Sequence, residues 1–290
     1  MNTPIDLTQL FAPDIVEALD YETIFNEMLQ ALRHKTDQFS TLIESDPAYK
    51  ILEVAAYREL LLRQRVNDAS KSVMLAYATG NDLDNLAALF GVKRQFTADP
   101  NSESKELIKE SDLRFRMRIP LSLEGHSTAG PIGAYKFHTL SASGQVKDVS
   151  VSTPEPGKVL VTILANTQTG LPSPELLNLI LEKLNHEDIR PLTDWVNVQS
   201  AQIIDYQVEA NIELNSGPGK MQSLENVRSK VNAFVQQAHQ LGNEITLSGL
   251  YAAMHQPGVK KVKLLHPLSD IQVTAEQAAY CNDIKIHSGQ

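Results

Sequence analysis

Cysteine is nearly absent from this chain of 290 residues, which contains only Cys281. A single thiol can form neither an intramolecular disulfide nor a CxxC metal site, and it suits a reducing compartment. Long apolar runs are also lacking, since no stretch approaches the roughly 18 residues of a membrane span. The opening residues, MNTPIDLTQLFAPD, lack the basic and apolar regions of a signal peptide. We therefore expect a chain that folds in a cytoplasm, is not exported by the general pathway and does not enter a membrane.

Basic residues are in short supply as well. The chain has 26 Lys and Arg against 35 Asp and Glu, which gives a formal net charge of -9. A surface that binds phosphate groups needs a clustered excess of Lys and Arg, so we expect no nucleic-acid partner. With 42% hydrophobic and 21% charged residues, a chain of this length can bury a core and form two or three domains.

The common catalytic motifs are missing too. The sequence has no HExxH, GxxxxGK[ST] or GxSxG motif, and no GxGxxG between a strand and a helix. Asp82 and Asp84 have no third oxygen ligand at EF-hand spacing, so helix capping is the favoured interpretation. His126 and Ser127 are adjacent on the backbone, where a base and a nucleophile rarely face each other. We expect no catalytic residue, no metal site and no cofactor.

Three weaker patterns have both a functional and a structural interpretation. The GPGK turn at 217–220 precedes a helix and could cradle phosphate, but a plain strand-to-helix connection is favoured. Arg63 and Arg65 could clamp a carboxylate, and a face of ion pairs is the favoured alternative. His138 and His255 end two short helices, where hydrogen bonds to carbonyl groups are favoured over metal binding.

The most informative feature that is present is a helical stripe. Apolar residues recur at alternating spacings of three and four from Leu52 to Ala76, interrupted only by Glu59, and predict a helix from Pro47 to Ala78. A second apolar line lies beside the first. A helix of about 32 residues is about 48 Å long, so we expect it to pack against other long helices. The predicted assembly interface comprises Leu52, Ala55, Tyr57, Leu61, Leu62, Val66, Ala69 and Val73.

Two shorter helices and a polar segment complete the first third of the chain. Asp20 is placed to cap a helix over residues 21–32, and Asp82 to cap a short helix that ends at Gly91. Residues 93–110 are polar and nearly without periodicity, which predicts a loop or linker. We therefore expect a helical region at 1–92 and a domain boundary within 93–110.

The rest of the chain contains a loose internal repeat. STAGPIGAYKFHTL leads into QVKDVSV, and ITLSGLYAAMHQ leads into VKKVKLL, so each copy predicts a short helix followed by a strand. Each copy also has a companion helix, at 174–185 and at 221–240. Strict alternation over 204–214 predicts a strand with one buried face, and 146–151 pairs with 159–163 as a hairpin. The predicted fold class is α+β, with a long-helix segment followed by two tandem related modules at 111–200 and 201–290.

Several long segments resemble one known family. They are YRELLLRQRVNDASKSVMLAYATGNDLDNLAALFGVKR, RFRMRIPLSLEGHSTAGPIGAYKFHTLSASGQVKDVSV, EDIRPLTDWVNVQS and LSGLYAAMHQPGVKKVKLLHPLSDI, preceded by DLTQLFAPDIVEALDYETI. Together they resemble the baseplate J-like proteins of contractile phage tails, including the J-type of Peduovirus-like phages and related tailocins. The likeness runs in order from about Ile5 to about Ile286.

The resemblance implies a structural, non-enzymatic subunit of a baseplate wedge, placed in a phage tail or tailocin particle and assembled in the host bacterial cytoplasm. In such wedges two copies join one copy of a second wedge protein through an N-terminal helix bundle. The C-terminal modules join neighbouring wedges into a ring, with the hub and the sheath-connecting wedge protein as further partners. The alternative is a soluble cytoplasmic enzyme, which predicts a charged cleft with perturbed pKa values between the two modules.

Overall fold

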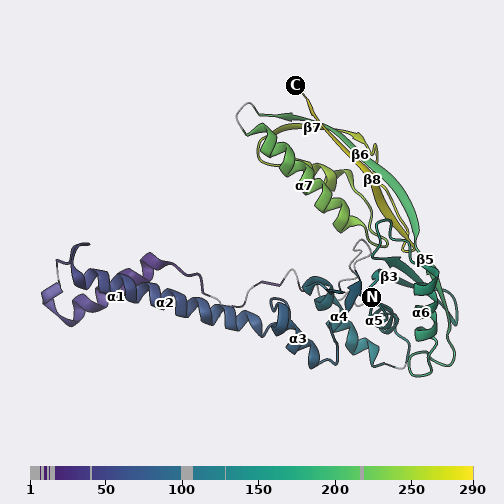
Figure 1. Cartoon of the computed structure of the whole chain (residues 1–290), viewed down its shortest axis with the longest axis horizontal. Coiled ribbons are helices and arrows are strands. Elements are labelled where there is room, and N and C mark those ends of the chain that lie inside the picture. The colour runs from purple at the N-terminus through teal and green to yellow at the C-terminus, as the bar shows by residue number, and fades with distance from the viewer. Residues whose placement is uncertain are drawn as a thin grey trace. The chain divides into compact units, whose positions relative to one another are not determined.

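The computed structural model describes residues 7, 10–11, 13, 17–39, 41–98, 107–127, 129–215 and 219–289. The chain divides into two compact units, Met1–Lys93 and Arg94–Gln290. The first unit is helical and the second combines helices with three small sheets (Figure 1). Within these described ranges, no helix is both long enough and apolar enough to cross a bilayer.

The helical unit consists of α1 (Tyr21–Lys35), a 3-10 turn η2 (Asp37–Phe39), α2 (Pro47–Ser72) and α3 (Gly80–Ala88). Asp20 caps α1 as predicted, because its carboxylate accepts a hydrogen bond from the Thr23 backbone N at 3.0 Å. Helix α1 packs along α2, and the buried contact is formed by Ile24, Phe25 and Ala56. Ala56 has no exposed surface, and its small side chain lets the two helices approach closely.

Helix α2 is shorter than predicted. It ends at Ser72 rather than Ala78 and is about 39 Å long. Its last turns contain Asn, Asp and Ser, which favour local hydrogen bonds over the helix ladder. The Ser70 and Ser72 hydroxyls donate to the carbonyls of Val66 and Ala69, at 2.8 and 2.9 Å. The prediction that the helix continues to Ala78 was therefore wrong.

Helix α3 also begins differently from the prediction. Its N-cap position is Thr79, and Asp82 lies in the first turn, where its charge interacts favourably with the helix dipole. The predicted cap at Asp82 was wrong by one turn. Gly91 ends this region in a left-handed conformation, with φ of 67°, as predicted.

The segment 93–110, expected to be a loop or linker, contains two short strands. Strands β1 (Phe96–Ala98) and β2 (Leu107–Lys109) form an antiparallel pair. Three residues are too few to show a periodic pattern, so the sequence did not reveal them. Helix α4 (Asp112–Gly125) follows and was also not foreseen. Its arginines at every second position imitate strand alternation, and Pro120 lies inside the helix.

The first α+β module has a sheet of three strands in the order β3-β4-β5. Strands β3 and β4 form the predicted antiparallel hairpin, with Val151 opposite Val161 and Gly157 in its turn at φ of 79°. Strand β5 runs parallel to β4, and α6 connects them. The elements are α5 (Ile132–Leu140), β3 (Val146–Glu155), β4 (Lys158–Ala165), α6 (Pro174–Leu184) and β5 (Trp195–Ser200).

The second module repeats this arrangement around β6 in a sheet ordered β7-β6-β8. The alternation predicted for β6 is confirmed, since Tyr206, Val208, Ala210 and Ile212 are all buried in one core with α7 and α8. Figure 1 shows α7 lying along the sheet. The elements are β6 (Gln202–Leu214), α7 (Lys220–Ala238), α8 (Leu247–Met254), β7 (Val259–His266) and β8 (Gln277–Gly289).

The two modules share their arrangement but not their order along the chain. In each, the central strand is antiparallel to one neighbour and parallel to the other. The companion helix α6 follows the α5–β3 pair, whereas α7 precedes the α8–β7 pair. The predicted α+β class with two related modules is therefore confirmed. The modules repeat the same spatial arrangement of strands, but their helices and strands follow one another in a different order along the chain.

The two modules are joined through an apolar contact and a hydrogen bond. Leu164 and Ala201 of the β4 and β5 region cluster with Ala278 of β8. Beside them, the Asp148 carboxylate accepts a hydrogen bond from the Leu241 backbone N at 2.9 Å. The second unit therefore contains both modules in one packed body.

Candidate assembly surface

Helix α1 covers only one side of α2. Leu52 and Leu60 face the core formed by Ile24, Phe25 and Ala56. One side of α2 therefore has a partner within this chain.

Further along α2 the same side is polar, and its side chains form hydrogen bonds with the segment before α1. The buried side-chain amide of Asn67 accepts from the Glu17 backbone N at 3.1 Å and donates to the Glu17 carbonyl at 2.9 Å. Arg63 donates through Nε to Glu59 at 2.9 Å and lies 3.4 Å from the Glu17 carboxylate. The hydrogen bond with Glu59 raises the pKa of Arg63. This side of α2 needs no external partner.

The opposite side of α2 carries two exposed apolar ridges. The helical period places them next to each other. Their large side chains are exposed to solvent, with an exposed fraction of 68% for Leu62, 56% for Val66 and 53% for Tyr57. Ridge A comprises Ile51, Ala55, Leu62, Val66 and Ala69, and ridge B comprises Val54, Tyr57 and Leu61. Apolar side chains gathered on one exposed face are typical of an interaction surface.

Six of the eight predicted interface residues lie on these ridges. Leu52 does not, because it packs in the α1 contact, and Val73 is the C-cap residue of α2, outside the helix. The sequence analysis overlooked Ile51, which is 69% exposed and occupies the first turns of ridge A. That these residues contact another chain stays a prediction.

Arg58 and Arg65 lie between the two ridges. Seven residues separate them, so they stand two turns apart on one line of the helix. Both are exposed. Of the two interpretations of Arg63 and Arg65, the favoured face of ion pairs is confirmed for Arg63, which pairs with Glu59 and Glu17.

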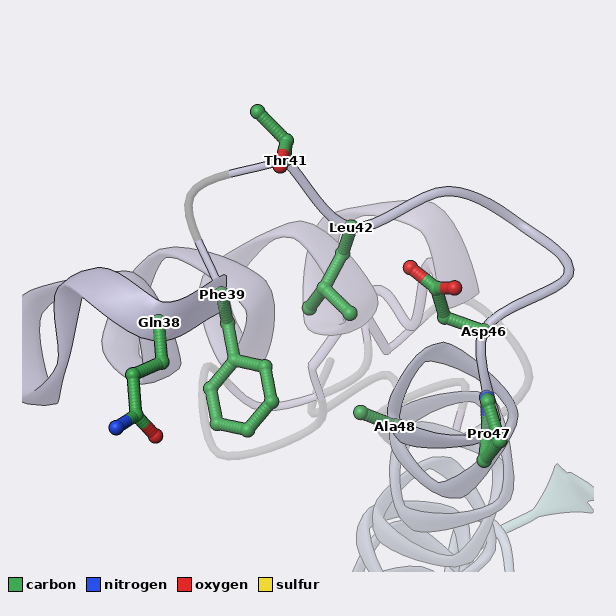
Figure 2. A pocket seen from close by; sticks show the side chains of 7 residues that line it. All are labelled: Gln38, Phe39, Thr41, Leu42, Asp46, Pro47 and Ala48. Atoms are coloured by element: carbon green, nitrogen blue, oxygen red, sulfur yellow. The ribbon is translucent and has the colours of Figure 1, made fainter.

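The hollows of the helical unit do not resemble an active site. One of about 410 Å³ lies where the chain turns into α2, and Figure 2 shows its lining side chains. The ionisable group in its lining is Asp46, whose carboxylate accepts a hydrogen bond from the Ile43 backbone N at 3.0 Å. The lining of a smaller hollow of about 90 Å³ includes Asp20, Glu27 and Arg63. Of these, Asp20 caps α1 and Arg63 pairs with Glu59 and Glu17. The lining of the larger hollow consists of Gln38, Phe39, Thr41, Leu42, Asp46, Pro47 and Ala48.

The remaining residues that the sequence suggested as metal or phosphate sites have positions that fit a structural role. His138 Nε2 lies 3.1 Å from the carbonyl of Gly125, at the end of α4 rather than of its own helix. His255 is the C-cap residue of α8. In the GPGK turn, Gly217 and Pro218 lie outside the described residues, and Gly219 is the N-cap of α7. Among the residues with described positions, no three His, Cys, Asp or Glu side chains gather to hold a metal ion.

One buried polar cluster was missed by the sequence analysis. The Glu110 carboxylate accepts hydrogen bonds from Arg118 Nε at 2.8 Å, from Arg118 Nη2 at 2.6 Å and from the Gln95 backbone N at 3.1 Å. Arg94 pairs with Asp112 at 2.8 Å. Glu110 precedes α4 and Arg118 lies within it, so no helical spacing links the two in the sequence. The cluster ties the β1–β2 pair to α4.

Comparison with known proteins finds matches to a single protein family. The family model described as Baseplate J-like N-terminal domain matches residues 44–101, and the model described as Baseplate J-like central domain matches residues 127–200. Baseplate protein J of Escherichia phage P2 is 42% identical over 296 residues, which covers 98% of both chains.

A solved structure is more distantly similar. It is the cryo-EM structure of the anti-feeding prophage baseplate, of which one chain is 12% identical with a TM-score of 0.33. The match covers 91% of the present chain and 53% of the other, so the present chain spans about half the length of that protein.

Proposed function

The chain belongs to the baseplate J-like protein family, and from this membership we propose that it is a structural subunit of the baseplate of a contractile phage tail or phage-tail-like particle. The proposal is supported by the nearly full-length similarity to a protein named as a baseplate component. The host bacterial cytoplasm is the proposed place of assembly.

Within the baseplate, we propose a place in the wedge. Two copies of the chain join one copy of a second wedge protein, and α2 takes part in their helix bundle. The C-terminal modules contact neighbouring wedges and close the ring, near the hub and the sheath-connecting wedge protein. The observation that carries this proposal is the pair of exposed ridges on α2, because apolar side chains are stabilised when another helix removes them from water.

The proposed role is mechanical rather than enzymatic. A ring that stays closed while its subunits move needs rigid parts joined by contacts that reorient. The alternative, an enzyme with a pocket between the modules, is opposed by what the described residues place there. Leu164, Ala201 and Ala278 pack together at this junction, and Asp148 binds the Leu241 backbone N beside them.

The experiment tests ridge A. The chain is produced together with the second wedge protein of its own particle, and the mass of the complex is measured by light scattering. Leu62→Asp and Val66→Asp place a carboxylate in the apolar contact and should weaken wedge formation at least tenfold, since loss of a central contact costs about 2 kcal/mol or more.

The matched control is Gln30→Asp, which adds the same charge on the exposed side of α1 and should leave assembly unchanged. Far-UV circular dichroism checks that each variant keeps its helix content. Complexes of normal mass and affinity from Leu62→Asp would contradict the assignment of α2 to the bundle.

A further inference from the structure

One of the two arginines between the ridges, Arg58, is surrounded by apolar side chains. The residues three and four positions from Arg58 on α2 are Val54, Ala55, Leu61 and Leu62, none of which carries a charge. A helix laid over both ridges would therefore also cover this guanidinium group.

Arg65 has one acidic neighbour at this spacing, Asp68. The Asp68 carboxylate accepts a hydrogen bond from the Gln64 side-chain amide at 2.7 Å. Within the described part of the chain, neither Arg58 nor Arg65 forms a hydrogen bond or an ion pair. Arg63 on the same helix has both, with Glu59 and Glu17. The chain thus pairs the arginine that faces its own segments and leaves the two on the open face without a partner.

We propose that this face of α2 binds a helix of a different protein, whose contacting side presents carboxylates about seven residues apart among apolar residues. This inference rests on the proposed function, which makes the ridges an interface. Covering the ridges removes the guanidinium groups from water, and a buried charge is strongly unfavourable unless it is paired. Carboxylates meet this need best, because they accept two parallel hydrogen bonds from each guanidinium group.

A second copy of the same face is a poor occupant. A symmetric α2–α2 contact brings the arginines of one copy close to those of the other when the helices run parallel and in register, and also when they run antiparallel with the contact centred between Arg58 and Arg65. Like charges at an interface discriminate against that pairing. The exposed side of α1 is polar, with Asn26 and Gln30, so α1 of another copy does not complement the ridges either.

The position of the charges also distinguishes this face from a membrane-binding one. In helices that lie on a bilayer, the cationic residues occupy the polar face, away from the apolar side that enters the lipid. Here the two arginines lie in the middle of the apolar side, where insertion into lipid would bury them.

The test uses the full chain as its own probe. The double variant Arg58→Glu, Arg65→Glu keeps both ridges and places carboxylates seven residues apart, so it is itself a helix of the proposed chemistry. An equimolar mixture of the unaltered and doubly substituted chains should form a heterodimer with a Kd at least tenfold lower than that of either chain alone, by analytical ultracentrifugation. High salt should weaken it. Self-association of the unaltered chain as tight as that of the mixture would overturn the proposal.

A charge-matched control and a conservative variant accompany this measurement. Arg33→Glu, Lys230→Glu makes the same change of charge at exposed positions on α1 and α7 and should not create a heterodimer. Arg58→Lys, Arg65→Lys keeps the positive charges and should retain binding to the acidic variant, though more weakly. Stronger binding of the unaltered chain than of Arg58→Glu, Arg65→Glu to vesicles of anionic phospholipid would overturn the proposal in favour of a membrane surface.

Measuring wedge assembly of the variants shows whether this inference or the proposed function has failed. If Leu62→Asp leaves the wedge intact, the proposed place of α2 in the wedge bundle fails, and with it the premise that the ridges are an interface. If Leu62→Asp disrupts the wedge while Arg58→Glu, Arg65→Glu assembles normally, the function stands and the acidic-partner inference is overturned. Disruption by both, with retention by the lysine variant, is the expected result.

Discussion

The carboxylate of Glu110 accepts two hydrogen bonds from the guanidinium group of Arg118, at 2.8 and 2.6 Å, and both side chains are buried. This bidentate pair connects the end of β2 with the middle of α4. The Arg118 guanidinium also lies 5.6 Å from the centre of the Phe115 ring. The pair is thus the polar centre of the region where the second unit begins.

Removing one partner of this pair should destabilise the second unit strongly. In Glu110→Gln the positive charge of Arg118 stays buried without its counter-charge, and breaking such a pair costs about 3 kcal/mol or more. In urea, the β1–β2 and α4 region of this variant should therefore unfold at a lower midpoint concentration. Hydrogen exchange of the amides in that region measures the midpoint. The control Glu155→Gln breaks the exposed pair with Lys158, which contributes below about 1 kcal/mol. Equal midpoints for the two variants would show that the buried pair contributes no special stability.

Buried His239 predicts a dependence of stability on pH. Burial, with a smaller effect of nearby Lys147, lowers its pKa to about 4 from an ordinary value of 6.5. Well above pH 6.5 the imidazole is neutral in both the folded and the unfolded chain. As pH falls below 6.5 the unfolded chain takes up a proton that the folded chain does not, so stability decreases until about pH 4, by an amount of about 3 kcal/mol.

His239→Phe removes this titration and keeps an aromatic ring near Tyr280, whose ring centre is 5.5 Å from that of the histidine. Its melting temperature should therefore fall less than that of the unaltered chain between pH 7 and pH 4.5. The control His34→Gln changes an exposed histidine on α1 and should follow the unaltered chain. Parallel pH curves for His239→Phe and the unaltered chain would rule out this role of His239.

Gly170 should tolerate no side chain. It has φ of 86°, and an added Cβ would lie 2.5 Å from Leu164 Cδ1 and 2.9 Å from His239 Nε2. Gly170→Ala therefore combines backbone strain with steric overlap and should lower the free energy of unfolding by about 1–3 kcal/mol. The matched change Gly219→Ala meets no atom within 4 Å and has an ordinary φ of -91°, so it should have little effect. Thermal unfolding of both variants measures the difference, and equal stabilities would contradict the described packing.

The contact between α1 and α2 depends on the small size of Ala56. Ala56→Leu adds three carbon atoms at a position that is completely shielded from solvent and should destabilise the packing of α1 by about 1–3 kcal/mol. Hydrogen exchange of the α1 amides should become faster, while the α+β modules remain protected. The control Ala88→Leu enlarges an exposed residue of α3 and should leave α1 unchanged. Unaltered α1 exchange in Ala56→Leu would indicate that α1 does not rest on α2 in solution.

Local patterns in the sequence predicted most of the regular elements. The alternation in β6, the helical spacing in α2 and the cap at Asp20 each depend on residues close along the chain, so they are readable without a fold. Errors arose where two local preferences compete, as at the end of α2, or where an element is too short or too irregular for a pattern, as in β1 and α4.

By itself, the sequence already specified an acidic, cysteine-poor α+β chain with a long helix that carries two apolar lines. These features follow from composition and from the spacing of nearby residues, which can be read without the fold. Only the fold could settle which side of α2 is covered by α1, and therefore that Leu52 packs against the α1 contact while Leu62, Arg58 and Arg65 are exposed. The fold likewise brought Glu110 to Arg118 and gave the two modules the same arrangement through different connections. Such contacts join residues without a fixed spacing, since they depend on how whole elements pack against one another.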